Sequence, residues 1–477
     1  MSASKIGVYG LGVMGRNLAL NLEEKGIRVS VYNRQVSGEE CIVEDFLNDE
    51  GSGKNFQGAG SAESFVKSLE TPRKILIMVK AGKPVDLVID ELLPFLQKGD
   101  IIIDGGNSNF HDTNRRVESL SSKGILFVGM GVSGGEEGAR YGPSLMPGGN
   151  ESAWGSSKSI LEAVSARAFD GSPCCAWMGE GGAGHFVKMV HNGIEYADMQ
   201  LIAEVYYFMK NGLKMSTAEI GEQFSAWSNT ELSSYLIEIT AEILTVTDDD
   251  GLPLVEKMLD SAGQKGTGKW TGVTALELGV PLPGITQAVF ARFASSLIDL
   301  RKQLSNKLDG PTPEIPGGRD EILNVLADAL LASRMVSYAE GFHLIKAAGD
   351  EFGWNIDAKS VARIWQGGCI IRSELLKVIA SAYRNNPNLE HLFLSDDFSS
   401  KLQNLQYGWR KITGLAVQHG IPVPNIMAAL GLYDSLRSER LPANLIQAQR
   451  DFFGAHSYER IDKPRGQFYH TDWKRKQ

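Results

Sequence analysis

Four polar residues share one face of a single predicted helix. Lys188, His191, Asn192 and Glu195 fall within a stretch of helical period that continues to about residue 210. At about 100° per residue they form one stripe, and most neighbouring positions outside it are apolar. Burying four polar groups without partners is costly, so the stripe predicts contact with a polar ligand. The alternative is a solvent-facing Lys and Glu beside a capping His.

The ends of this stripe are spaced for a chain-like ligand. Lys188 and Glu195 lie about 10 Å apart along the helix axis, which suits the bracketing of a bound six-carbon chain. His191 and Glu195, at i and i+4, could instead hold a metal ion. No third ligand is obvious nearby in the sequence, because His185 lies on another face of the helix. We therefore predict no metal.

A glycine pattern near the N-terminus predicts a dinucleotide site. Residues 10–15 read Gly-Leu-Gly-Val-Met-Gly, after a short apolar strand and before a helical stretch. In this setting Gly10 allows a tight turn, Gly12 lets the backbone approach a pyrophosphate, and Gly15 lets helix and strand pack closely. The free N–H groups and the dipole at the helix start attract phosphates.

The end of the second predicted strand indicates which dinucleotide binds. Residues 29–32 are followed by Asn33 and Arg34, where a site for NAD usually carries Asp or Glu to bind the ribose 2′-hydroxyl. A guanidinium at this position suits a 2′-phosphate instead. The sequence therefore predicts NADP as the cofactor.

Short apolar strands alternate with helical stretches through the first third of the chain, which predicts a doubly wound parallel sheet. Three further strands are expected at 74–79, 100–104 and 125–128, followed by polar or glycine-rich loops at 80–82, 105–108 and 129–135. Ligands of such sheets bind beyond the carboxyl ends of the strands, so we expect these loops to face cofactor and substrate. Plain strand–helix turns are the alternative.

The rest of the chain is predominantly helical in period. Two stretches show a faint repeat, with Glu195-Tyr196 before Trp227 in the first and Ser337-Tyr338 before Trp365 in the second. The predicted fold class is an α/β Rossmann-like domain, a large all-α domain of duplicated helical units, and a C-terminal tail. The boundaries fall at 1–180, 181–440 and 441–477.

Composition narrows the functional class and the compartment. The net charge is −9 with scattered Lys and Arg, which disfavours a nucleic-acid partner. The four cysteines form no C-x-x-C pair, which fits reduced thiols in the cytoplasm. We expect no membrane span and no signal peptide, because no apolar run reaches spanning length and the first strand begins near residue 5.

A lysine in a glycine-rich loop adds a possible anion site. Residues 263–269 satisfy G-x-x-x-x-G-K, but Trp270 stands where a phosphate-binding loop of nucleotide triphosphatases needs Ser or Thr for Mg²⁺. The run also follows a helical stretch instead of a strand. A loop of this kind can still hold an anion through the charge of Lys265 and backbone donors.

Together these motifs resemble the 6-phosphogluconate dehydrogenase family of NADP-dependent decarboxylating enzymes of the pentose phosphate pathway. The resemblance rests on the helix stripe, on Gln-Lys-Gly-Thr-Gly-x-Trp within 260–270, on the NADP-type first strands and on segment 441–456, which is similar to the C-terminal hallmark of the family. It runs essentially end to end. It implies a homodimer in which the tail of each subunit reaches into its partner.

The resemblance also implies site residues. NADP contacts would be made by Gly10, Leu11, Gly12, Val13, Met14, Gly15, Asn33, Arg34, Gln35, Val79, Lys80, Ala81 and Asn107. Substrate contacts would be made by Asn107, Ser133, Gly134, Gly135, His191, Asn192, Tyr196, Lys265 and Arg292, with Arg450 and His456 contributed by the other subunit. Gln35 stands where many members carry Thr, a mild departure within the 2′-phosphate site.

The implied reaction oxidises the C3 hydroxyl of 6-phosphogluconate and releases C1 as CO₂, giving ribulose 5-phosphate and NADPH. Lys188 would be the catalytic base and Glu195 would protonate C1 of the enediol. A free lysine has a pKa near 10.4, so the site must lower the pKa of Lys188 for it to act as a base near neutral pH.

Two other functions share part of this pattern. Another β-hydroxyacid dehydrogenase, acting on a smaller acid, would use the same Lys-bearing helix, but its usual chain is much shorter and has one helical unit. A non-catalytic NADP sensor would keep the glycine pattern and Arg34 without needing both Lys188 and Glu195.

Overall fold

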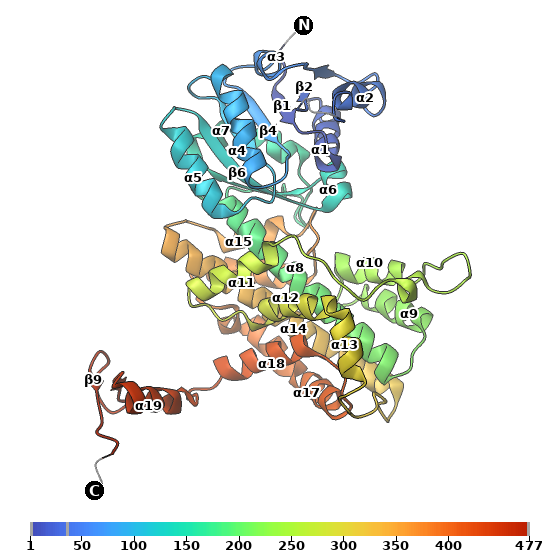
Figure 1. Ribbon diagram of the computed structural model, residues 1–477, viewed down its shortest axis with the longest axis vertical. Coiled ribbons are helices and arrows are strands. Elements are labelled where there is room, and N and C mark those ends of the chain that lie inside the picture. The colour runs from blue at the N-terminus through green and yellow to red at the C-terminus, as the bar shows by residue number, and fades with distance from the viewer. Residues whose placement is uncertain (1–2, 35–37, 475–477) are drawn as a thin grey trace. The chain divides into compact units, whose positions relative to one another are not determined.

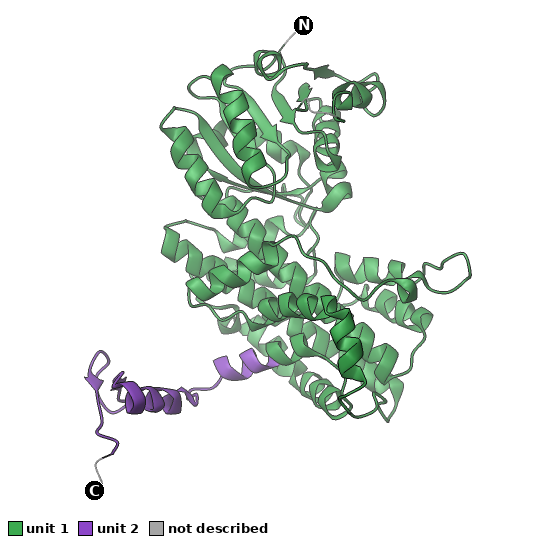
Figure 2. Cartoon of the chain, in the orientation of Figure 1, with its two compact units in different colours: residues 1–429 green, residues 430–477 purple. Residues whose placement is uncertain are grey.

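The computed structural model describes residues 3–34 and 38–474. The chain forms two compact units, residues 1–429 and 430–477 (Figure 2). The first unit contains a sheet with flanking helices and then a large set of helices. The second unit is a short helix with a small hairpin.

A seven-stranded sheet organises the N-terminal part of the first unit, in the order β3-β2-β1-β4-β5-β6-β7. Strands β1, β2, β4 and β6 of this sheet are labelled in Figure 1. Its strands are β1 Ile6–Tyr9, β2 Val29–Tyr32, β3 Phe56–Gly58, β4 Lys74–Ile77, β5 Ile101–Asp104, β6 Leu126–Ser133 and β7 Ser144–Gly149. Its helices are α1 Val13–Glu24, α2 Ile42–Asn48, α3 Ala62–Lys67, α4 Lys83–Leu92, α5 Phe110–Ser121, α6 Gly135–Tyr141 and α7 Glu151–Val164. Strands β1 to β6 pair in parallel, while β7 runs antiparallel to β6.

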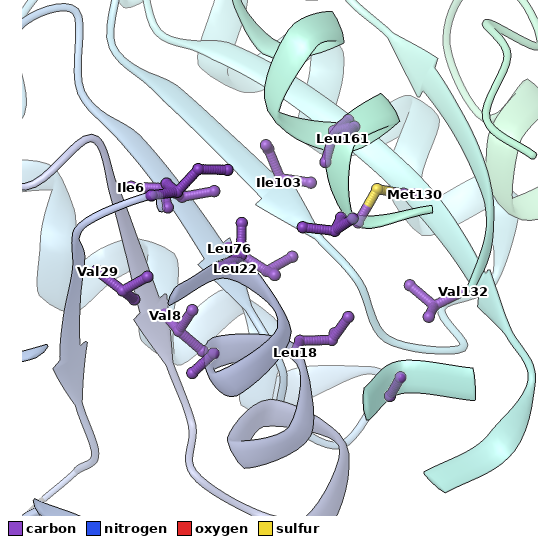
Figure 3. Close-up of a cluster of buried hydrophobic side chains, with 14 of the residues drawn as sticks. Ile6, Val8, Leu18, Leu22, Val29, Leu76, Ile103, Met130, Val132 and Leu161 are labelled. Carbon is purple, nitrogen blue, oxygen red and sulfur yellow. The ribbon is translucent and has the colours of Figure 1, made fainter. Parts of the chain in front are cut away.

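Both faces of the sheet are covered by helices, as the doubly wound prediction requires. On one face, Leu18 and Leu22 of α1 pack with Val8 of β1, Leu76 of β4 and Leu161 of α7 (Figure 3). Side chains of α3, α4 and α5 form a second buried cluster against the opposite face. Alternate strand residues point to opposite faces, so burial of both requires the near-continuous apolar runs seen in the sequence.

The structure corrects the predicted sheet at three places. Strands β3 and β7 are absent from the prediction, and β6 continues to Ser133 through residues 129–133, which the prediction assigns to a loop. Glycine and proline are depleted in strands, and β7 contains Pro147, which the sheet accommodates because β7 is an edge strand. The sheet is therefore mixed at this edge.

Two long helices form the centre of the helical part, α8 Ala183–Tyr207 and α14 Arg319–Phe352. They pack against each other, and α17 packs along α14. The remaining helices are α9 Thr217–Trp227, α10 Tyr235–Ile243, α11 Thr267–Glu277, α12 Pro283–Ser296, α13 Ile298–Ser305, α15 Ala358–Ile364, α16 Leu375–Asn385, α17 Asp396–Gln418 and α18 Pro424–Leu436.

Two buried glutamates show how the duplicated halves interlock. Glu204 of α8 accepts two backbone N–H groups at the start of α18, at 2.8 and 3.0 Å. Glu340 of α14 accepts two at the start of α12, at 2.8 and 2.9 Å. The segments before the capped helices match, Gly-Val-Pro-Leu-Pro-Gly-Ile at 279–285 and Gly-Ile-Pro-Val-Pro-Asn-Ile at 420–426. The long helix of each half thus caps a helix of the other half.

Helix α14 departs from the expectation that no segment reaches membrane-spanning length. Among the described residues it alone is long and apolar enough, with a mean hydropathy of 1.3 over its most apolar window. Inside the structure 83% of that window is buried. Its apolar length therefore serves as the core of the helical part.

The second unit folds around one carboxylate. It contains the end of α18, helix α19 Ala443–Gly454 and a hairpin of β8 Tyr458–Glu459 and β9 Phe468–Tyr469. Asp451 of α19 is fully buried and accepts hydrogen bonds from the backbone N–H groups of Ser457 and Thr471 and from the rings of His470 and Trp473, at 2.8 to 3.1 Å. These bonds tie the hairpin to the helix.

Candidate active site

A cavity of about 980 Å³ opens beyond the carboxyl ends of β1, β2 and β4. Seven predicted cofactor contacts line it: Gly10, Leu11, Gly12, Asn33, Arg34, Val79 and Lys80. The sheet brings these residues together from three separate loops, as expected for ligands at the carboxyl edge of parallel strands.

The glycines at this edge form a cradle that fits a dinucleotide. Gly10 has a φ of +99°, and a Cβ added there would overlap the carbonyl group of Met78. A Cβ on Gly15 would overlap the carbonyl oxygen of Gly10. Gly12 borders open space just before α1, and no side chain caps that helix, so its first N–H groups remain available to phosphates.

The side chains at the end of β2 hold the rim of this cavity. Asn33 Oδ1 accepts the N–H of Leu11 at 3.1 Å, which joins the β2 loop to the glycine loop. Arg34 is exposed at the rim, and its guanidinium forms a two-pronged ion pair with Glu39. Gln35 lies outside the described residues.

Other predicted cofactor contacts lie at the start of α1 and in the loops after β4 and β5. Val13 is exposed, while Met14 and Ala81 are partly exposed. Asn107 is exposed in a loop that Asp104 holds, since Asp104 accepts from the N–H of Gly106 and the hydroxyl of Ser108 at 3.0 and 2.6 Å.

Lys188, His191 and Asn192 of the α8 stripe are buried and Glu195 is partly exposed, which excludes a solvent-facing stripe. Lys188 and His191 are 6% and 0% exposed. His191 Nδ1 lies 3.4 Å from Lys188 Nζ and 3.9 Å from Glu195 Oε2, so the imidazole stands between the amine and the carboxyl group. Its Nε2 lies 2.9 Å from Ser133 Oγ at the end of β6, and its Nδ1 lies 3.1 Å from Asn192 Oδ1.

Glycines allow the start of α8 to rest directly on the sheet. A Cβ on Gly131 of β6 would overlap Cβ of Lys188, and one on Gly184 would overlap carbonyl oxygens of β6 and β7. Gly134 and Gly135 then turn the chain from β6 into α6 with φ values of +111° and +62°. The glycines of residues 129–135 therefore serve helix–strand contact as well as the turn.

Burial sets the protonation of the stripe. It lowers the pKa of Lys188 to about 8, although the nearby charge of Glu195 opposes this shift. Burial and the charge of Lys188 lower the pKa of His191 well below its usual range. Burial raises the pKa of Glu195. Near neutral pH the site therefore combines a neutral imidazole with an amine that can release its proton, and the Glu195 carboxyl group binds a proton more readily than an exposed one does.

Basic groups gather at the Glu195 end of the stripe. The guanidinium of Arg292 lies 3.7 Å from the centre of the Tyr196 ring, and its Nη1 donates to the carbonyl of Gly263 at 2.7 Å. The backbone N–H of Lys265 contacts the Tyr196 hydroxyl at 3.4 Å, and the Lys265 side chain is exposed. Positive charge thus stands beside the carboxyl group of the stripe.

Comparison with known proteins identifies the family. Residues 5–179 match the model of the NAD binding domain of 6-phosphogluconate dehydrogenase, and residues 184–473 match the model of its C-terminal domain. The chain belongs to the 6-phosphogluconate dehydrogenase family.

Relatives in this family are similar over nearly their whole length. The decarboxylating 6-phosphogluconate dehydrogenase of Haemophilus influenzae is 54% identical over 98% of this chain and 96% of its own, and that of Homo sapiens is 53% identical over 99% and 97%. The solved 6-phosphogluconate dehydrogenase of Plasmodium falciparum superposes with a TM-score of 0.94 at 42% identity, covering 98% of this chain and all of that one. That enzyme was solved in its apo form, with NADP⁺ and with 6-phosphogluconate.

Two residues that the family resemblance assigns to the substrate lie in the second unit. Arg450 and His456 are both exposed, near the end of α19 and just after it. Arg450 Nη1 donates to Gln447 Oε1 at 3.3 Å. Their side chains are therefore accessible to another molecule.

Some residues near the site are absent from the sequence prediction. Thr267 Oγ1 accepts a hydrogen bond from Asn192 Nδ2 at 3.2 Å. The sequence feature that could have indicated Thr267 is its position in the glycine-rich segment of Lys265. Tyr9 and Glu91 line the cofactor cavity, and the Tyr9 hydroxyl donates to Glu91 at 2.6 Å. No sequence pattern indicates that Glu91 lies near the cofactor cavity, because only the packing of α4 brings it there.

The described residues contain no group of three or more His, Cys, Asp or Glu side chains placed to hold a metal ion. His191 and Glu195, the pair considered above, instead face Lys188.

Proposed function

We propose that this chain catalyses the NADP-dependent oxidative decarboxylation of 6-phospho-D-gluconate to D-ribulose 5-phosphate, CO₂ and NADPH. The observation that carries the proposal is the buried stripe of α8, where His191 stands between Lys188 and Glu195. The names of its relatives and the ligands of the Plasmodium enzyme support the same reaction and cofactor.

Lys188 is the proposed base of the oxidation. With a pKa of about 8, its amine is partly unprotonated near neutral pH and can take the proton of the C3 hydroxyl. NADP, when bound, supplies the acceptor for the hydride that leaves C3. The protonated amine then donates a hydrogen bond to the new 3-keto group, which draws electrons from the C1–C2 bond as CO₂ departs.

Glu195 is the proposed acid of the final step. Burial raises the pKa of Glu195, which favours the protonated form relative to an exposed carboxyl group, and we assign to it the donation of a proton to C1 of the enediol. His191 separates the two groups and is held by Ser133. This arrangement places the amine and the acid close enough to act on neighbouring carbons of the bound chain.

The remaining predicted contacts have polar or basic roles. We assign Asn107, Ser133, Gly134, Gly135, His191, Asn192 and Tyr196 to the hydroxyl and carboxylate groups of the substrate, and Lys265, Arg292 and Arg450 with His456 to its phosphate end. Guanidinium groups suit a phosphate because they donate two parallel hydrogen bonds. For NADP, the backbone of residues 10–15 would hold the pyrophosphate and Arg34 with Gln35 the 2′-phosphate, with Asn33, Val79, Lys80, Ala81 and Asn107 completing the contacts.

The proposed assembly is a homodimer in which each tail supplies Arg450 and His456 to its partner. Large apolar side chains exposed on α12, on α13 and at the residue between them support contact with a second copy of the chain, because monomers rarely expose many large apolar side chains together. They are Phe290, Phe293, Leu297, Leu300 and Leu304.

We propose domain boundaries at residues 180 and 440. We also propose a cytoplasmic location, which the four free cysteines support.

The test is NADP reduction by the purified protein with 6-phosphogluconate, with released CO₂ trapped in parallel. Gluconate and 3-hydroxyisobutyrate serve as controls that lack the phosphate or the longer chain. Equal amounts of NADPH and CO₂ from 6-phosphogluconate alone are expected. Turnover of 3-hydroxyisobutyrate in its place would show a dehydrogenase for smaller acids, and binding of NADP without any turnover would show a sensor.

A further inference from the structure

The guanidinium of Arg34 already has an anionic partner inside the cofactor cavity. Its Nε donates to Glu39 Oε2 at 3.1 Å and its Nη2 donates to Glu39 Oε1 at 3.0 Å. Asn33 Nδ2 also donates to Glu39 Oε2, at 3.2 Å. Glu39 and Arg34 both line the cavity. The carboxylate therefore occupies one two-donor edge of the arginine.

A 2′-phosphate and this carboxylate require the same kind of partner. Both are anions whose oxygens accept the parallel N–H groups of a guanidinium. While Glu39 holds Arg34, a phosphate either displaces the carboxylate or binds a guanidinium whose charge is partly neutralised. In the second case the two anions also repel each other at close range. Either route weakens the binding of the phosphate.

Glu39 remains charged under working conditions. Its hydrogen bond to Arg34 lowers the pKa of the Glu39 carboxyl group below its ordinary value. The neighbouring Glu40 lies outside this arrangement, since its carboxylate accepts the N–H of Gly38 at 2.8 Å. Of these two adjacent glutamates, only Glu39 is placed to act on the cofactor.

We propose that Glu39 is a selectivity-determining residue that competes with the 2′-phosphate for Arg34 and thereby reduces the preference for NADP over NAD. The proposal rests on the proposed NADP site. It predicts that removal of the Glu39 charge strengthens binding of the phosphorylated cofactor and leaves binding of its unphosphorylated counterpart unchanged.

The experiment measures the binding of two nucleotides by calorimetry. Adenosine 2′,5′-bisphosphate and adenosine 5′-monophosphate differ only in the 2′-phosphate, and neither requires turnover. Glu39→Gln is expected to bind the bisphosphate about twofold to fivefold more tightly, the range for an exposed ion pair, with unchanged affinity for the monophosphate. The gain should shrink at high salt. Glu40→Gln is the control, because it removes the same charge one residue away.

The same change should appear in turnover. The ratio of kcat/KM for NADP to that for NAD should rise in Glu39→Gln by the same factor and stay constant in Glu40→Gln. In an Arg34→Ala background, Glu39→Gln should have a smaller effect, because the competition for the guanidinium is gone and only the repulsion between the two anions remains.

Two results separate failure of this inference from failure of the cofactor assignment. If Arg34→Ala removes the advantage of the bisphosphate but Glu39→Gln equals Glu40→Gln, Glu39 does not compete and the inference is wrong. Weaker bisphosphate binding in Glu39→Gln would also overturn it, by showing that Glu39 orients Arg34. If Arg34→Ala leaves the preference for the bisphosphate over the monophosphate unchanged, the 2′-phosphate does not bind at Arg34 and the proposed site is wrong.

Discussion

At the scale of single residues, the chemistry depends on three side chains that burial changes in different directions. The amine of Lys188 loses its proton more easily, Glu195 holds its proton more strongly, and His191 stays neutral between them. An exposed stripe would leave lysine protonated and glutamate ionised near neutral pH. Burial on the sheet therefore turns a common polar stripe into an acid–base pair.

The pKa of Lys188 predicts the acidic limb of the pH profile. A base with a pKa of about 8 is protonated below that pH, so kcat/KM for 6-phosphogluconate should fall as the pH drops from about 8 to 6. Lys188→Ala should lose roughly 10²- to 10⁴-fold in kcat, the usual contribution of a general base. The measurement is the rate of NADPH formation across this range, with NADP affinity followed separately. A variant with normal rates would remove Lys188 from the mechanism.

At the scale of elements, glycines decide how closely α8 approaches the sheet. Strand β6 carries Gly129 and Gly131 beneath the first turns of the helix, and α8 itself carries Gly184. The same segment ends at Ser133, which holds His191. The contact between strand and helix therefore places both the amine and the imidazole.

Replacement of Gly131 tests this contact. In Gly131→Ala the new Cβ would overlap Cβ of Lys188, so α8 must shift. We expect a loss of about 1–3 kcal/mol in the free energy of unfolding, as for overpacked cores, together with a lower kcat. Gly155→Ala on α7 is the control, because its added Cβ would meet no atom within 4 Å apart from its chain neighbours and the backbone of its own helix, and alanine favours helices. Equal behaviour of the two variants would contradict the close-approach argument.

The cap that α14 supplies to α12 gives a second prediction at this scale. The Glu340 carboxyl group has two oxygens that can accept whether or not it carries a proton, whereas a glutamine side chain has one, so Glu340→Gln leaves one buried N–H at the start of α12 without a partner. We expect a loss of about 1–3 kcal/mol in the free energy of unfolding, measured by denaturant titration. An unchanged value would show that the cap contributes nothing.

The difference in the free energy of unfolding between wild type and Glu340→Gln should depend on pH. Burial raises the pKa of Glu340 from 4.5 to about 8, so the folded protein binds this proton more tightly than the unfolded chain. Its contribution to stability is complete below about pH 4.5 and is lost as the pH rises through about 8. The difference between wild type and Glu340→Gln should therefore decrease over this interval. A difference that grew with pH would refute the assignment.

At the scale of the whole molecule, the proposed site is incomplete without a second chain. Arg450 and His456 belong to a unit that folds around Asp451, while Lys188 and Glu195 belong to the first unit. In the proposed homodimer, the aromatic and aliphatic side chains exposed on α12 and α13 would contact the partner. Catalysis and assembly would then depend on each other.

Subunit mixing tests this dependence. Lys188→Ala and Arg450→Ala homodimers should both be nearly inactive with 6-phosphogluconate. In a mixed dimer one site combines intact Lys188 with Arg450 from the partner, so co-expression in equal amounts should restore about a quarter of wild-type activity. The control is a chain that carries both Lys188→Ala and Arg450→Ala. Its dimers have no site with an intact Lys188 or Arg450. If mixing restores nothing, Arg450 acts in its own subunit or not at all.

The sequence by itself determined the features that depend on local order along the chain. The glycine pattern at 10–15, the strand at 29–32 and the stripe of α8 follow from spacing, because turns and periodic elements are encoded by neighbours a few residues apart. Strand β7 and the extension of β6 did not follow, since their glycines and proline are tolerated only through edge position and contact with α8.

Only the tertiary structure decided the states of the side chains. From spacing alone, the α8 stripe could face solvent or form a site. Burial in the structure decides for a site. Burial also sets the protonation of the side chains, because the pKa of a group depends on its surroundings. The pairing of Glu39 with Arg34, the bond from Thr267 to Asn192 and the reciprocal caps of Glu204 and Glu340 join residues whose partners no local pattern specifies. Such contacts arise when distant segments pack together, and they determine the chemistry of the site.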